Sequence, residues 1–236
     1  MTNAGLVVLF ESAHVVVVDK PAGIATEPDR DKHTSMRDLV EAWVKTRDGD
    51  STRAPHAVSR LDTNVSGAVT FALTELGMRK AAAAKEHGHI VRRYVAITEP
   101  TAAKEGRWTT PVQGKSALTR WKRIAEVDGR AALLLLEPET GRTHQLRIHA
   151  SLAGAAIVGD ARYGGKPTIA DASGRVQRVE RVLLHAAAVR VSFGLPADPP
   201  GFVLAPIPPA LRAAWQSLDG APEAWNDVEH ACVGSF

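Results

Sequence analysis

Residues 59–67 read Ser-Arg-Leu-Asp-Thr-Asn-Val-Ser-Gly and contain one carboxylate, Asp62, in a setting suited to chemistry. Arg60 lies two residues before this Asp, small polar residues follow it, and the apolar run 68–73 comes directly afterwards. The pattern predicts a polar turn that leads into a strand with at least one buried face. A carboxylate there can act in catalysis, but a turn Asp can also cap its own loop. Taken alone, this stretch favours the structural role.

A second cluster, residues 139–149, holds two arginines and two histidines within eight positions. We expect this stretch to begin a helix that runs to about residue 152. Helical spacing would then place Thr143 and Arg147 on one face. A cationic helix start is suited to binding phosphate. His144 and His149 could instead bind a metal, but no third or fourth ligand lies nearby in the sequence, so we expect no metal site.

A third stretch, residues 120–123, reads Arg-Trp-Lys-Arg within a predicted strand over 117–127. Basic residues around an aromatic side chain can bind nucleic acid by stacking on its bases. They can equally protect the exposed edge of a sheet by charge. The sequence leaves these two interpretations open.

Composition and charge narrow the function classes. The chain has 236 residues, room for one large or two small domains, and one cysteine, Cys232, which excludes an internal disulfide framework. No targeting signal or membrane-length apolar run is present, so we expect an untargeted cytoplasmic protein without a membrane partner. The net charge is +3, but residues 219–236 carry four acidic and no Lys or Arg side chains. The remaining 29 basic and 22 acidic residues leave a net +7, which favours a polyanionic partner.

The elements that must position these residues alternate between strands and short helices. Hydrophobic periodicity predicts strands at 6–10, 15–18, 67–73, 91–97, 117–127, 131–137, 182–191 and 202–205. It predicts helices at 36–46, 74–87, 139–152 and 210–218, with Thr74 as the N-cap of the second. Asp128 and Gly129 suit a tight hairpin turn. No linker divides the chain, so we expect a single domain over residues 1–218, followed by an acidic, loosely ordered tail over 219–236.

Five stretches resemble the RluA-type pseudouridine synthases, and they follow one another along the chain in the order that the family shows. Residues 59–67 are similar to the family's central His-Arg-Leu-Asp-x-x-Thr-Ser-Gly motif. Residues 92–96 resemble its basic-x-Tyr-x-Ala strand. The other similar stretches are the entry motif at 19–23, the long signature at 141–149 with its continuation through 157–160 and 163–164, and the late strand at 183–186. Such an ordered set over roughly residues 6 to 205 is far more specific than one motif.

Two positions depart from the family pattern. Ser59 stands where the family has His, and Val65 stands where it has Thr. Neither change removes the carboxylate of Asp62. Val65 exchanges a hydroxyl for a methyl, which loses a possible turn hydrogen bond of about 1 kcal/mol. We expect these changes to affect substrate choice and rate more than reaction type.

The resemblance implies that the protein isomerises uridine to pseudouridine in structured RNA, either ribosomal or transfer RNA, and requires no cofactor. It assigns Asp62 as the catalytic carboxylate, acting either as a nucleophile or as a base. It implies that Arg147 pairs with Asp62 and aims the carboxylate. It also implies that Tyr94 stacks on the target base. A half-buried aromatic without such a function is the structural alternative for this tyrosine.

The remaining assignments concern substrate binding. Base flipping requires a group to fill the vacated place in the RNA, and Arg60 is our candidate. Leu184 is expected to form an apolar wall of the pocket. We assign Arg142, Thr143 and His144 to substrate binding.

The resemblance also implies an α+β fold with a mixed, mainly antiparallel sheet, flanking helices and a central active-site cleft. We expect no N-terminal accessory RNA-binding domain, because the first predicted strand begins near residue 6, and we expect a monomer. Recognition of RNA would then depend on the loops 25–34, 100–116 and 166–181. Two other classes stay open: an RNA-binding module without turnover, and a hydrolase that uses Asp62 with His144 or His149.

Overall fold

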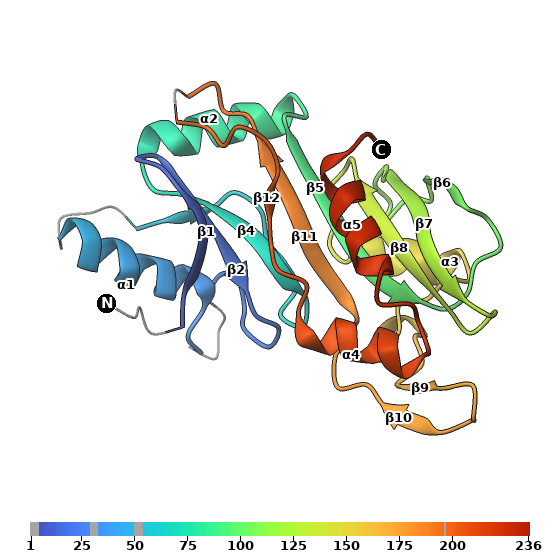
Figure 1. The fold of residues 1–236 in the computed structure, drawn as a ribbon. Helices are drawn as coiled ribbons and strands as arrows, with labels where there is room; N and C mark the ends of the chain where they lie inside the picture. Colours follow the sequence, from blue (N-terminus) through green and yellow to red (C-terminus); the bar gives the residue numbers. More distant parts are fainter. Residues whose placement is uncertain (1–4, 29–32, 50–53, 196) are drawn as a thin grey trace. The chain divides into compact units, whose positions relative to one another are not determined.

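The computed structural model describes residues 5–28, 33–49, 54–195 and 197–236 (Figure 1). Parts of the predicted loop 25–34 and of the connection over 47–58 lie outside these residues. The chain divides into two compact units. Unit 1 comprises Met1–Val91 and Ala188–Pro206, and unit 2 comprises Arg92–Ala187 and Ile207–Phe236. The single domain expected over residues 1–218 stays a prediction.

Unit 1 is built on an antiparallel set of strands. The predicted first hairpin is confirmed by β1 (Val7–Glu11) and β2 (Val15–Lys20), and β2 pairs in turn with β4 (Ser66–Ala72). Every residue of β4 is buried, so the strand after Asp62 is covered on both faces. The other pairs join β3 (His56–Ala57) to β4, and β12 (Val203–Leu204) to the second half of β11 (Leu184–Val191).

Two helices of unit 1 begin with side-chain caps. In α1 (Met36–Asp48), Ser35 and Asp38 form a capping box. In α2 (Glu75–Glu86), the Thr74 hydroxyl accepts from the Gly77 N–H, as its position before the helix predicted. One face of the unit 1 strands packs with α2 in an apolar cluster that includes Val15, Val17, Ala68, Ala72, Ala81 and Ala84.

Unit 2 contains four antiparallel strands in the order β5–β8–β7–β6. Their bounds are Ile90–Thr98 for β5, Glu105–Trp108 for β6, Thr119–Val127 for β7 and Ala131–Pro138 for β8. The β7–β8 turn confirms the Asp-Gly prediction, because Asp128 and Gly129 both have positive φ and the Arg130 N–H donates to the Val127 carbonyl. A separate hairpin joins β9 (Thr168–Ala170) to β10 (Val176–Arg178).

The helices of unit 2 correct two predictions. Helix α3 spans Gln145–Leu152 and begins six residues later than expected. His144 has φ 56° and ψ 20°, a left-handed conformation that cannot continue a right-handed helix, so residues 139–144 form a loop. Residues 219–236 are not loosely ordered, because they contain α5 (Ala224–Val233). The other helices are the short 3₁₀ helix η1 (Ala161–Tyr163) and α4 (Pro209–Ser217).

Helix α5 is ordered because it has an apolar face and a cationic partner. Trp225, Val228 and Cys232 are spaced three and four residues apart and are buried. Arg93 on β5 donates from Nη1 to the carbonyls of residues 231, 232 and 234 at 3.0, 3.0 and 2.7 Å. Its Nε also donates to Glu137 at 2.8 Å. This buried arginine satisfies carbonyls at the helix C-terminus that the helix itself cannot satisfy.

The fold class predicted from the sequence is confirmed: helices flank a mixed, mostly antiparallel sheet. Within the parts of the chain that the structure describes, every helix is too short or too polar to cross a lipid bilayer.

Candidate active site

Asp62 lies in a β-turn immediately before β4. The Val65 N–H donates to the Asp62 carbonyl at 3.0 Å, with Thr63 and Asn64 at the exposed centre of the turn. The Asp62 residue is half-buried, and Arg60 is exposed. The predicted polar turn is therefore present, with its carboxylate at the start of a fully buried strand.

Two buried residues far away in the sequence hold this turn. Lys20 is fully buried, and its Nζ donates to the carbonyls of Pro21, Ile24 and Thr63 at 2.9, 2.6 and 3.1 Å. The Thr26 hydroxyl donates to the Leu61 carbonyl at 3.0 Å and accepts from the Leu61 N–H at 3.1 Å. The backbone on both sides of Asp62 is thus fixed. Lys20 belongs to the entry motif at 19–23, and its buried role was not predicted from the sequence.

Tyr94 and Leu184 both belong to unit 2 and are both buried. Tyr94 lies in β5 opposite Leu136 of β8, with 7% of its surface exposed. Leu184 is the first residue of β11 and is 3% exposed. The placement of Leu184 is compatible with an apolar wall. A buried tyrosine on a strand is compatible with both the functional and the packing interpretation.

Arg147 lies in α3 and is bound at two points by Asp160. Its Nε donates to Oδ2 at 2.6 Å, and its Nη2 donates to Oδ1 at 2.7 Å. The ring of Tyr163 lies on the guanidinium, with 5.0 Å between Cζ and the ring centroid. Asp160 is 1% exposed, so this is a buried, charge-assisted pair. Sequence reasoning included Asp160 and Tyr163 in a matching motif but assigned them no role.

The glycine pattern after α3 supports this pair. Gly159 has φ +82°, and a Cβ on Gly159 would collide with the Arg181 carbonyl. A Cβ on Gly165 would likewise collide with the Ile157 carbonyl. The backbone around Asp160 therefore folds back on itself at a separation that only glycine permits.

The loop before α3 is organised by Gln145. Its Oε1 accepts from the Thr140 hydroxyl at 2.7 Å and from the Arg142 N–H at 3.1 Å. Thr143 is exposed in this loop, so the predicted helical face shared by Thr143 and Arg147 is wrong. His144 is placed by a 2.7 Å hydrogen bond between its Nδ1 and the Tyr163 hydroxyl.

His149 has a structural environment. Its Nε2 lies 2.8 Å from the Thr110 carbonyl, which can only accept, so Nε2 carries a proton. Its Nδ1 lies 2.9 Å from the Thr119 hydroxyl, and the residue is 1% exposed. Both ring nitrogens are therefore engaged, which argues against His149 as a metal ligand or as the base of a hydrolase. Among the residues that the structure describes, no cluster of His, Cys, Asp and Glu has the geometry to hold a metal ion.

Comparison with known proteins decides the family. A family model described as RNA pseudouridylate synthase matches residues 14–152, which is more than half of the chain. The chain belongs to the RNA pseudouridylate synthase family. It is 35% identical over 174 residues to the uncharacterized RNA pseudouridine synthase YhcT of Bacillus subtilis strain 168, and this match covers 67% of the chain and 57% of the relative. The chain therefore spans little more than half the length of that relative.

A second relative supports the RluA-type resemblance. The dual-specificity RNA pseudouridine synthase RluA of Yersinia pestis is 29% identical over 210 residues, covering 81% of this chain and 96% of that protein. Among solved structures, the human RNA pseudouridylate synthase domain containing 4 has a TM-score of 0.72. That match covers 90% of this chain and 93% of the human chain at 19% identity, so it supports the fold alone. The RluA-type membership predicted from the five motifs is confirmed.

The Arg-Trp-Lys-Arg stretch of β7 is explained by packing within unit 2. Trp121 is 6% exposed and stacks on Trp108, with ring centroids 5.4 Å apart. Arg120 pairs with Glu137 and also with Glu139. These contacts favour packing over base stacking. The prediction of a charged sheet edge at this stretch is wrong, because β6 lies outside β7 and makes it an inner strand.

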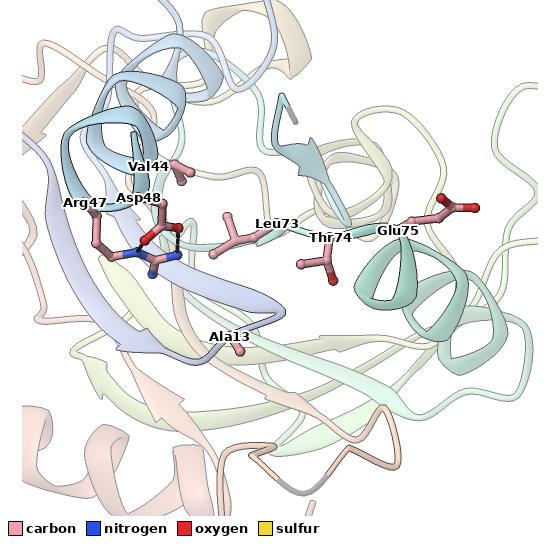
Figure 2. Close-up of a pocket in the computed structure, with 7 residues that line it drawn as sticks. All are labelled: Ala13, Val44, Arg47, Asp48, Leu73, Thr74 and Glu75. Carbon is pink, nitrogen blue, oxygen red and sulfur yellow. Dashed lines mark hydrogen bonds and ion pairs between the residues drawn. The ribbon is translucent and has the colours of Figure 1, made fainter. Parts of the chain in front are cut away.

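A hollow of about 320 Å³ lies elsewhere in unit 1 (Figure 2). Its wall is formed by Ala13, Val44, Arg47, Asp48, Leu73, Thr74 and Glu75. Two bonds join the Arg47 guanidinium to the Asp48 carboxylate at 2.7 and 2.5 Å, as the dashed lines show. None of the candidate catalytic residues lines this hollow, and its main charged groups neutralise each other.

Proposed function

We propose that this protein is an RNA pseudouridine synthase that isomerises uridine to pseudouridine, with Asp62 as the catalytic carboxylate. The observation that carries the proposal is the fixed turn of Asp62. Lys20 and Thr26 hold the backbone on both sides, so the carboxylate is presented from a rigid scaffold at the start of a buried strand. Such preorganisation is what a reacting group requires.

The reaction balances without a redox partner. The bond from the sugar C1′ to N1 of the base breaks, the base rotates, and a new bond joins C1′ to C5. The proton on C5 is lost and N1 gains one, so the product is an isomer of the substrate. Asp62 would act either as a nucleophile on the sugar or ring, or as a base that removes a sugar proton.

Arg147 and Tyr94 are assigned supporting roles. Asp160 occupies Nε and Nη2 of Arg147, which fixes the orientation of the guanidinium and of its second terminal nitrogen, Nη1. The family resemblance implies that Arg147 pairs with Asp62, and we propose this pairing for the protein. Tyr94 would stack on the target base, and Leu184 would form an apolar wall of the pocket.

We assign substrate binding to Arg60, Arg142, Thr143 and His144. Arg60 is exposed, so its side chain is accessible for insertion into an RNA stack. Arg142 and Thr143 are exposed on the loop before α3. The substrate would be ribosomal or transfer RNA, modified by a monomer in the cytoplasm.

Nucleoside analysis tests the proposal directly. Purified protein is incubated with bulk RNA from a strain that lacks the gene, and the digested nucleosides are separated and quantified. We expect new pseudouridine with the wild-type protein and with the exposed-surface control Asp227→Asn, and none with Asp62→Ala. Mapping the modified positions then identifies the RNA and the uridine.

The other outcomes separate the alternative classes. RNA binding without pseudouridine would favour a binding module, and RNA cleavage that depends on Asp62 would favour a hydrolase. Full activity in Asp62→Ala would refute the assignment of the catalytic carboxylate while leaving the reaction itself supported.

A further inference from the structure

Arg92 is a cation in unit 2 that makes no ion pair or hydrogen bond through its side chain within the described part of the chain. It lies in β5 two residues before Tyr94, so the two side chains leave the strand on the same face. The Nε of Arg92 is buried and has no hydrogen-bond partner among the described residues. We propose that Arg92 and the loop at residues 140–144 bind a backbone phosphate of the substrate RNA beside Tyr94. This inference rests on the proposed function and extends it to a specific contact.

Arg93, the next residue of β5, contrasts with Arg92 because its guanidinium is bonded within the fold. Arg93 points to the opposite face, where its Nε donates to Glu137 and its Nη1 to three carbonyls. The carboxylates at the end of β8 are also engaged, since Arg120 pairs with both Glu137 and Glu139. Within the described chain, these carboxylates are therefore paired with other arginines, although a buried polar atom such as Nε of Arg92 normally has a partner.

The loop after β8 leaves room beside the guanidinium. A Cβ on Gly141 would lie 3.6 Å from Nη1 and 3.7 Å from Nη2 of Arg92, so the guanidinium lies directly against this glycine. Arg142, the next residue, is exposed, and its Nε donates to the Ser116 carbonyl at 3.0 Å. The guanidinium of Arg92 thus lies beside a loop position that has no side chain, directly before the exposed Arg142.

The ligand class follows from this chemistry. A guanidinium binds phosphate through two parallel N–H donors, and an arginine without an internal carboxylate keeps those donors for a ligand. Arg92 and Tyr94 are separated by about 7 Å along the strand. A nucleotide stacked on Tyr94 would therefore have its own or its neighbour's phosphate within reach of the long Arg92 side chain.

Binding measurements on the full chain test the site without requiring turnover. The probe is a short RNA hairpin with uridines in its loop, titrated over a range of salt concentrations. For Arg92→Gln we expect about tenfold weaker binding. We also expect the slope of the binding constant against salt concentration, on logarithmic axes, to fall by the amount that corresponds to about one phosphate contact. The control is Arg212→Gln, which removes an arginine on α4 of the same unit whose side chain is 45% exposed and pairs with Glu229 at 3.3 Å.

A second pair of variants keeps the test valid if Arg92→Gln folds poorly. Gly141 does not have positive φ, and a Cβ there makes only ordinary contacts, so Gly141→Glu and Gly141→Gln are both sterically accommodated. Gly141→Glu places a carboxylate beside Arg92 and should weaken RNA binding about tenfold, whereas neutral Gly141→Gln should change it far less.

Equal affinity and equal salt dependence in wild type, Arg92→Gln and Gly141→Glu would overturn the phosphate site. That result with normal pseudouridine formation would leave the proposed function intact. Conversely, Arg92-dependent RNA binding by a protein that forms no pseudouridine would support the site and refute the isomerase.

Discussion

Arg147 and Asp160 form a two-point ion pair in the interior of unit 2, with N–O distances of 2.6 and 2.7 Å. The pair joins α3 to the turn before η1, and Tyr163 covers the guanidinium from one side. Because a planar guanidinium is held in its own plane by the carboxylate and on its face by the ring, its direction is fixed. Asp160 is therefore a positioning residue for Arg147.

Asp160→Asn should lower both stability and turnover. Breaking a buried pair leaves an uncompensated cation, which costs roughly 3–5 kcal/mol. We expect the free energy of unfolding in urea to fall by about this amount, and kcat to fall more than tenfold at a temperature where the variant is folded. Asp227→Asn, on the exposed side of α5, should change neither quantity. Unchanged turnover in folded Asp160→Asn would refute the positioning role.

Lys20→Met should impair turnover through the Asp62 turn. The substitution keeps the length of the side chain but leaves the carbonyls of Pro21, Ile24 and Thr63 without their donor. Unsatisfied buried carbonyls cost about 1–3 kcal/mol each, so we expect lower stability and at least tenfold lower kcat. RNA affinity should remain within about threefold of wild type, because the substitution does not remove an exposed phosphate contact. The matched control is Lys45→Met, since Lys45 is exposed and pairs with Glu41 on α1.

Arg93→Met should release α5 from β5. The variant loses the contacts to Glu137 and to three carbonyls near the chain end, and we expect a destabilisation of roughly 3–5 kcal/mol. Limited proteolysis should then cut within residues 219–236 before it cuts the strands. Arg212→Met removes an exposed pair with Glu229 and should cost less than about 1 kcal/mol. Equal protease resistance in the two variants would contradict the prediction that Arg93 holds α5 against β5.

Cys232 should give the protein an alkaline stability limit. Burial raises the pKa of its thiol to about 12; Arg93 opposes this shift and Glu229 adds to it. The unfolded thiol ionises near pH 8.5, so the contribution to stability is complete below that pH and is lost as the pH rises towards 12. Cys232→Ala should therefore lose less stability than wild type between about pH 8 and pH 10.5 in urea unfolding. The native thiol should also react slowly with thiol reagents at about pH 8, because the thiolate is the reactive form.

Local sequence predicted the turn and strand around Asp62, the cap at Thr74 and the Asp-Gly hairpin correctly. Each depends on neighbours in the chain: alternation of apolar residues, a hydroxyl before a helix, and two residues that tolerate positive φ. The same local reasoning failed at residues 139–144, because His144 adopts a left-handed conformation that its residue type does not reveal. It failed at α5 because the acidic residues dominated the composition while the buried face was spaced three and four residues apart.

The sequence by itself determined the family, the catalytic candidate and the order of the elements, since these are read from residue types and short spacings. Only the tertiary structure decided which buried charges meet. Lys20 donates to the carbonyl of Thr63, which is 43 residues away in the sequence, and Arg93 donates to that of Gly234, which is 141 residues away. Such partners are chosen by the requirement that every buried polar group be satisfied, and that requirement acts through packing in space rather than through adjacency in the chain.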